Sequence, residues 1–113
     1  MKLKEIVDRL NLKVRSGEGK LDCEVTGGCA SDLLSNVIAV AKPGNVWLTM
    51  QVHVNIVAVA VLKELGAIII VQGREPAEDA LKKARDENVA ILISDLATYE
   101  TAGKLYALGI GSG

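Results

Sequence analysis

The chain has 113 residues, half of them apolar but only 3% aromatic, and its formal net charge at pH 7 is -1. A fold of this size buries roughly two thirds of the surface that its unfolded chain exposes, so the sequence predicts one domain over residues 1–113 with an aliphatic core. The charges are interspersed and form no basic stripe, which argues against a nucleic-acid partner. The longest apolar run, residues 56–62, is too short to cross a bilayer, and residues 1–10 do not resemble a signal peptide. We therefore expect a cytoplasmic protein with no membrane association.

The first predicted element is a short amphipathic helix over residues 2–10, where apolar side chains recur at helical spacing. Alternating apolar residues then predict half-buried strands around residues 12–14 and over residues 21–25, with a turn at residues 16–19 between them. The pattern defines residues 1–24 less sharply than the rest of the chain.

A second helix is predicted to begin near Ser31, a favourable N-cap, and to end at Pro43-Gly44, before a buried strand at residues 46–49. The run over residues 56–62 is ambiguous, because its β-branched residues favour a strand whereas its length and flanks favour a helix. We interpret it as a helix with Gly66 at its C-cap. A helix that is apolar on nearly every side needs cover from the fold or from a second subunit.

The remaining elements alternate regularly. A strand is predicted at residues 67–71, and Pro76 suits the first turn of a helix that reaches about residue 88. A strand at residues 89–93 and a helix capped by Thr98 and ended by Gly109 follow, and the tail is expected to fray. This order predicts an α/β fold, a single three-layer domain with a mostly parallel sheet and right-handed βαβ crossovers.

Ligands of parallel sheets bind at the carboxyl ends of the strands, where helix N-termini also attract anions. Three predicted loops lie there, and their candidate ligand-binding residues are Gln51, His53 and Asn55, then Gln72, Gly73 and Arg74, then Ser94, Asp95 and Thr98. A fourth candidate is an anion-binding nest at Thr26, Gly27 and Gly28, although a tight turn between strand and helix explains this segment equally well.

Each candidate has a structural alternative. Asn55, Asp95 and Thr98 are also suited to cap helices, and Arg74 is placed to pair with Glu75 in a solvated loop. His53 can serve only to satisfy a hydrogen bond of its loop.

Neither a metal site nor a catalytic set is evident. The two cysteines, Cys23 and Cys29, and the single histidine, His53, are too few for a closed four-ligand zinc site in one subunit, so we expect free thiols and no cofactor. The sequence also lacks a G-x-x-x-x-G-K-[ST] phosphate loop and a G-x-G-x-x-G fingerprint. We therefore expect no enzyme activity; a small transferase or hydrolase with His53 as general base ranks last.

Five segments together resemble a DRTGG domain, over nearly the whole chain from about Val25: VTGG at 25–28, SDLL at 31–34, VWLT at 46–49, IIIV at 68–71 with GREP at 73–76, and AGKL at 102–105. The chain is similar to the small stand-alone members and, more distantly, to the N-terminal domain of HPr kinase. The naming Asp-Arg and Thr-Gly-Gly of the family correspond here to residues 52–53 and 71–73, where only Gly73 is retained.

This resemblance implies a regulatory module without catalytic residues that forms a homodimer, and small members imply a redox or hydrogenase-related protein partner. Combined with the polar strand-end loops, it predicts a ligand-sensing module that binds a nucleotide or other phosphorylated metabolite. The alternative is a structural adaptor that binds a protein partner and no small molecule.

Overall fold

The structure is a computed structural model, and it describes residues 1–112. Its strands form one five-stranded sheet in the order β1-β5-β4-β3-β2. They are β1 (Lys13–Ser16), β2 (Gly27–Ala30), β3 (Asn45–Thr49), β4 (Ala67–Ile70) and β5 (Ile91–Ile93). The strands β2 to β5 are parallel and β1 is antiparallel to β5, so the prediction of a mostly parallel sheet is confirmed.

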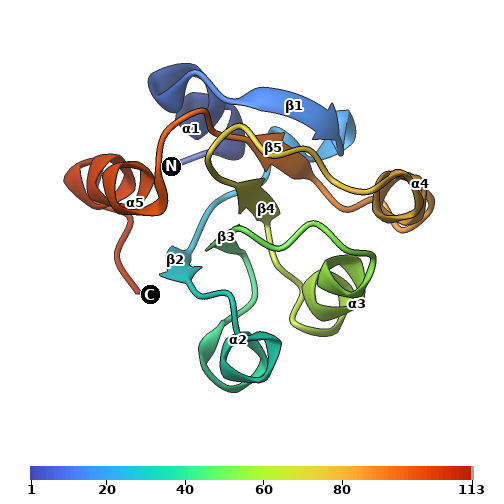
Figure 1. Ribbon diagram of the computed structural model, residues 1–113. Helices are drawn as coiled ribbons and strands as arrows, with labels where there is room; N and C mark the ends of the chain where they lie inside the picture. Colours follow the sequence, from blue (N-terminus) through green and yellow to red (C-terminus); the bar gives the residue numbers. More distant parts are fainter. Residues whose placement is uncertain (113) are drawn as a thin grey trace.

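Helices cover both faces of the sheet (Figure 1). The helices are α1 (Leu3–Leu10), α2 (Leu34–Val40), α3 (Asn55–Leu62), α4 (Glu78–Asp86) and α5 (Thr98–Ala107), and a 3-10 turn, η1 (Glu18–Lys20), follows β1. The crossovers through α2, α3 and α4 each advance the chain by one strand in the same direction, which places these helices together on one face. Because α1 and α5 pack on the other face, the domain has the three layers that the sequence predicts.

The core lies on the two faces of the three central strands, which are buried along their whole length. Alternation sends Trp47, Ile68 and Ile91 toward α2, α3 and α4, whereas Leu48 and Ile69 pack beneath α1 and α5. Burial on both sides explains why these strands are unbroken aliphatic runs. Trp47 is fully buried and its Nε1 donates a 2.8 Å hydrogen bond to the Ser31 carbonyl, so its polar atom is satisfied.

The interpretation of the apolar run as a helix is confirmed by α3, but its C-terminus differs from the prediction. The left-handed residue after the helix is Glu64, with φ of 54°, and not Gly66. Gly66 is required for a different reason, because a Cβ there would lie 2.9 Å from the backbone oxygen of Gly44. The chain therefore keeps this glycine for a close backbone approach.

The predicted strand over residues 21–25 is wrong. The segment forms only one isolated bridge, between Lys2 and Glu24, and its carbonyl groups instead receive the first N–H groups of α1. Leu3 donates to Cys23 at 3.0 Å and Lys4 donates to Leu21 at 2.8 Å. The segment thus satisfies a helix N-terminus, which local alternation of apolar residues cannot distinguish from strand pairing.

Four helix-end predictions also need correction. Ser31 donates its N–H to β3, so α2 begins only at Leu34. Asn55 and Thr98 are the first residues of α3 and α5 and do not cap them, and Pro76 precedes α4 by two residues.

The tail is not frayed as far as Gly111, whose carbonyl accepts the N–H of Gly28 at 2.7 Å. None of the helices in residues 1–112 is long and apolar enough to span a membrane.

Candidate functional site

A depression of about 190 Å³ lies at the carboxyl ends of β2, β3 and β4. Its lining residues are Asp32, Met50, Gln51, Val52, His53 and Arg74. Three predicted site residues therefore come together: Gln51 and His53 from the loop after β3, and Arg74 from the loop after β4. Adjacent parallel strands bring these loops to one edge, as the rule for such sheets requires.

Asp32 fixes the geometry of this depression. Its Oδ1 accepts hydrogen bonds from Thr49 Oγ1 at 2.9 Å and from the Met50 N–H at 2.7 Å. Its own carbonyl accepts Gln51 Nε2 at 3.0 Å. The carboxylate thus binds the loop after β2 to the end of β3, and the Gln51 side chain has a structural bond of its own. Sequence reasoning missed Asp32 as a site residue; the available signal was an acid directly after a strand at the carboxyl edge.

Arg74 and His53 are the groups of the depression that remain available to a ligand. Both are exposed, and no hydrogen bond or ion pair within residues 1–112 engages either side chain. α3 begins at Asn55, two residues after His53, so the positive end of that helix dipole lies beside the imidazole. The depression therefore presents a guanidinium and an imidazole beside one anchored carboxylate.

Gln72 and Gly73 have a structural role in the loop after β4. Their φ angles are 62° and 64°, and their N–H groups donate 2.8 Å hydrogen bonds to the carbonyls of Leu96 and Ser94. These two N–H groups are thus occupied, so they do not form an anion cradle. Glycine suits position 73 because φ is positive and a Cβ would lie 3.4 Å from Asp95 Oδ1.

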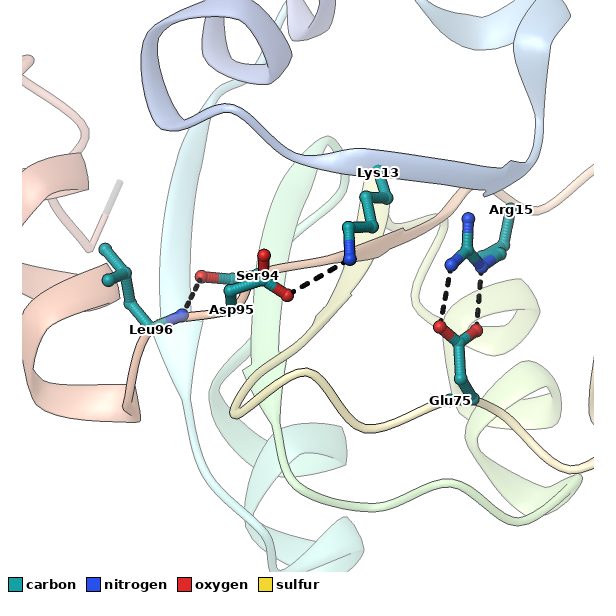
Figure 2. A network of polar contacts seen from close by, with 6 residues as sticks. All are labelled: Lys13, Arg15, Glu75, Ser94, Asp95 and Leu96. Atoms are coloured by element: carbon teal, nitrogen blue, oxygen red, sulfur yellow. Dashed lines mark hydrogen bonds and ion pairs between the residues drawn. The ribbon is translucent and has the colours of Figure 1, made fainter.

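The loop after β5 is separate from the depression, so the predicted residues Ser94, Asp95 and Thr98 do not join the others. Ser94 is buried, its Oγ lies 2.9 Å from Thr101 Oγ1, and it accepts the Leu96 N–H at 3.2 Å. Asp95 forms an ion pair of 3.4 Å with Lys13 of β1 (Figure 2).

The alternative in which Arg74 pairs with Glu75 is wrong, because Glu75 binds Arg15 of β1. Two hydrogen bonds of 2.7 Å join this carboxylate to Nε and Nη2 of the guanidinium (Figure 2). The Arg15 hydrogen bonds lower the pKa of Glu75 below its ordinary value and raise that of Arg15. Both side chains are partly exposed, so solvent screens the pair and it adds little to the stability of the fold.

The predicted anion nest at Thr26, Gly27 and Gly28 is also wrong, because Gly27 and Gly28 belong to β2 and pair with β3. Thr26 Oγ1 donates to the Pro43 carbonyl at 2.7 Å and accepts a hydrogen bond from Asn45 Nδ2 at 3.1 Å. These two bonds join the segment before β2 to the start of β3. These residues are structural.

An apolar cleft of about 200 Å³ lies between β2 and α5, and sequence reasoning missed it. Its side-chain lining includes Ala30, Leu48, Leu105, Tyr106 and Ile110. Cys29, the neighbour of Ala30, is a half-buried free cysteine, and burial raises the pKa of its thiol. No group of three metal-ligating side chains occurs within residues 1–112.

The fold places the chain in the class of small three-layer α/β domains. A similar solved structure is that of the CBS and DRTGG domains of the regulatory region of a Clostridium perfringens pyrophosphatase, complexed with the activator diadenosine tetraphosphate. The TM-score is 0.76 at 11% sequence identity, over 92% of this chain. This chain corresponds to 45% of the length of that one. The likeness supports a DRTGG-like fold. No known family matches the sequence, and no curated protein does.

Proposed function

We propose that the chain is a non-catalytic regulatory module that senses a phosphate-bearing metabolite, such as a nucleotide, in the depression at the strand ends. The observation that carries this proposal is that Arg74 and His53 line the same depression, with His53 two residues before the start of α3. A guanidinium matches the geometry of phosphate oxygens, and a helix N-terminus favours negative charge. The ligand-bound regulatory region with a similar fold is consistent with this assignment.

The size and charge of the depression restrict the class of ligand that it can bind. At about 190 Å³ it is smaller than the roughly 300–1,000 Å³ of sites that enclose a whole organic ligand, so it suits one phosphate group with its nearest neighbours. Asp32 disfavours a second negative charge and is an acceptor for a hydroxyl beside the phosphate. A nucleoside monophosphate, with a ribose next to its single phosphate, meets both conditions better than inorganic phosphate does.

Thermal denaturation with nucleoside phosphates tests this function. A ligand at about 100 times its dissociation constant should stabilise the folded state by roughly 2.7 kcal/mol. Arg74→Ala should weaken binding about tenfold or more, whereas Arg85→Ala, on the distant α4, should leave it unchanged. A flat response to every nucleoside phosphate, or equal effects of the two variants, would refute the sensing function.

The proposal excludes catalysis and includes a homodimer in a cytoplasmic setting. No hydrogen bond in residues 1–112 joins the His53 ring to a serine, threonine or carboxylate, so the structure offers no activated nucleophile beside it. The homodimer is supported by the resemblance to DRTGG domains and by the apolar surface beside β2, which the next subsection describes.

An adaptor function is the second candidate, and exposed aliphatic residues favour it. Neither α2 nor α3 contains a charged residue. The exposed large aliphatics gather on these helices and just before them: Leu33, Ile38, Val40, Val54, Val61 and Leu62. Exposed aliphatic side chains on two helices that contact each other are typical of a protein interface, and a redox or hydrogenase-related protein is the proposed partner. This function predicts that nucleotides leave the melting temperature unchanged. It also predicts a complex with that partner in gel filtration, and Leu62→Lys should disrupt this complex.

A further inference from the structure

β2 is an edge strand whose outer backbone groups face away from the sheet. Ser31 donates its N–H to β3, so by alternation Cys29 also faces β3, while Gly28 and Ala30 face outward. The bond from the Gly28 N–H to Gly111 in the tail confirms this direction. The outward groups are therefore the N–H and carbonyl of Gly28 and of Ala30.

The two edges of the sheet differ in how they are protected. Natural edge strands avoid pairing with other chains through charges, proline or bulges. β1 has two such features, since it carries Lys13 and Arg15 and its pairing with β5 shifts register between Val14 and Ser16. β2 has the sequence GGCA and an unbroken register with β3, so it has no charge, proline or bulge. The tail covers part of this edge, because the Gly28 N–H donates to the Gly111 carbonyl.

We propose that two copies of the chain pair through β2, antiparallel and centred on Cys29, so that the two sheets become one continuous sheet. In this register Gly28 lies opposite Ala30 of the second copy, and the two residues exchange both of their hydrogen bonds. The two-fold axis repeats this exchange, so every outward group of β2 is paired. Centring the axis on Gly28 or Ala30 instead leaves half of these groups without a partner in β2.

Two short paired strands are only marginally stable by themselves, so a dimer through β2 must also bury apolar surface. Such surface lies beside this edge. Ala30 and Tyr106 line the cleft between β2 and α5, and Tyr106 is 76% exposed. Leu33 follows β2 and is 64% exposed. A second β2 would cover this surface, and its chain would displace the single bond that Gly111 makes with Gly28. The interface specifies the homodimer of the proposed function and does not require a ligand.

Removal of one outward N–H is the first test. Ala30→Pro deletes the Ala30 N–H but no bond to β3, because this residue faces outward; Ala30→Ser keeps the N–H and is the matched control. Sedimentation velocity at micromolar concentration should find a dimer for the native chain and for Ala30→Ser, and a monomer for Ala30→Pro. A monomeric native chain would refute the pairing, as would a dimer that survives Ala30→Pro or is lost only in Leu62→Lys.

Oxidation tests the register without altering the edge. In a non-hydrogen-bonded antiparallel pair the two Cα atoms are about 4.5 Å apart, within the range of about 4.4–6.8 Å that a disulfide spans. Diamide, which accepts the two electrons and two protons released by two thiols, should therefore link Cys29 to Cys29 of the second copy at mildly alkaline pH. The linked dimer should persist in Cys23→Ser and vanish in Cys29→Ser. Linkage through Cys23 alone, or no linkage in a dimer, would overturn the register.

Discussion

Replacement of Asp32 by alanine tests how the carboxyl edge of the sheet is held together. The carboxylate receives one hydrogen bond from the Thr49 hydroxyl and one from the Met50 N–H, at 2.9 and 2.7 Å. A hydrogen bond to a charged group contributes about 1.5–3 kcal/mol. Because Asp32 is exposed, each of its two bonds should contribute about half of that range. Because Thr49 is fully buried, its hydroxyl would lose an acceptor that water cannot readily replace. The expected loss of unfolding free energy is about 2 kcal/mol.

Urea denaturation followed by circular dichroism measures this loss. Asp32→Asn is the matched control, because its amide oxygen retains both hydrogen bonds and only the charge is removed, so it should cost less than half as much. If Asp32→Ala changes the free energy of unfolding by less than about 0.5 kcal/mol, the value of a neutral surface substitution, the carboxylate does not hold the two loops. An equal effect of the two variants would instead assign the loss to charge alone.

Two further predictions concern a glycine and an ion pair. Gly17→Ala should destabilise the fold by about 2–5 kcal/mol in the same denaturation experiment, because φ is 79° and the new Cβ would lie 2.4 Å from the Ala90 Cα. Gly19→Ala, where a Cβ meets nothing within 4 Å, should be nearly neutral. Since Arg15 lowers the folded-state pKa of Glu75, this pair stabilises the fold above the usual pKa of glutamate and the contribution is lost as pH falls through the lowered value. The stability difference between the native chain and Glu75→Gln, which is small at neutral pH, should therefore disappear in acid; a difference that grows in acid would contradict the sign.

The parts of the fold that could be predicted from sequence are those in which local pattern and burial agree. β3, β4 and β5 are short aliphatic runs between turn signals, and both faces of these strands are buried. The helix α3 was identified from its length and flanking residues against the strand preference of its valines. β2 was missed because two of its residues are glycines, which have low strand propensity; pairing with the buried β3 determines its conformation.

The candidate site was predicted only in part, because side-chain anchoring between distant residues leaves no local signal. Gln51, His53 and Arg74 follow adjacent strands, and the rule for strand ends was enough to find them. Asp32 acts through Thr49, 17 positions along the chain, so its role depends on the pairing of β2 with β3. Ser94 and Asp95 also follow the end of a strand, but Ser94 hydrogen-bonds to Thr101 and Asp95 forms an ion pair with Lys13. Only the tertiary structure reveals these contacts.

The position of β1 in the sheet has a consequence for synthesis of the chain on the ribosome. β2, β3 and β4 each pair with the strand that follows next, so these contacts form between neighbouring segments as the chain emerges. β1 is made first but pairs with the last strand, and Lys13 lies opposite Ile93. Closing that long loop early is entropically unfavourable, so the N-terminal strand must wait unpaired until nearly the whole domain has been made. The lysine and arginine that protect this edge in the folded domain also keep the waiting strand from pairing with other nascent chains.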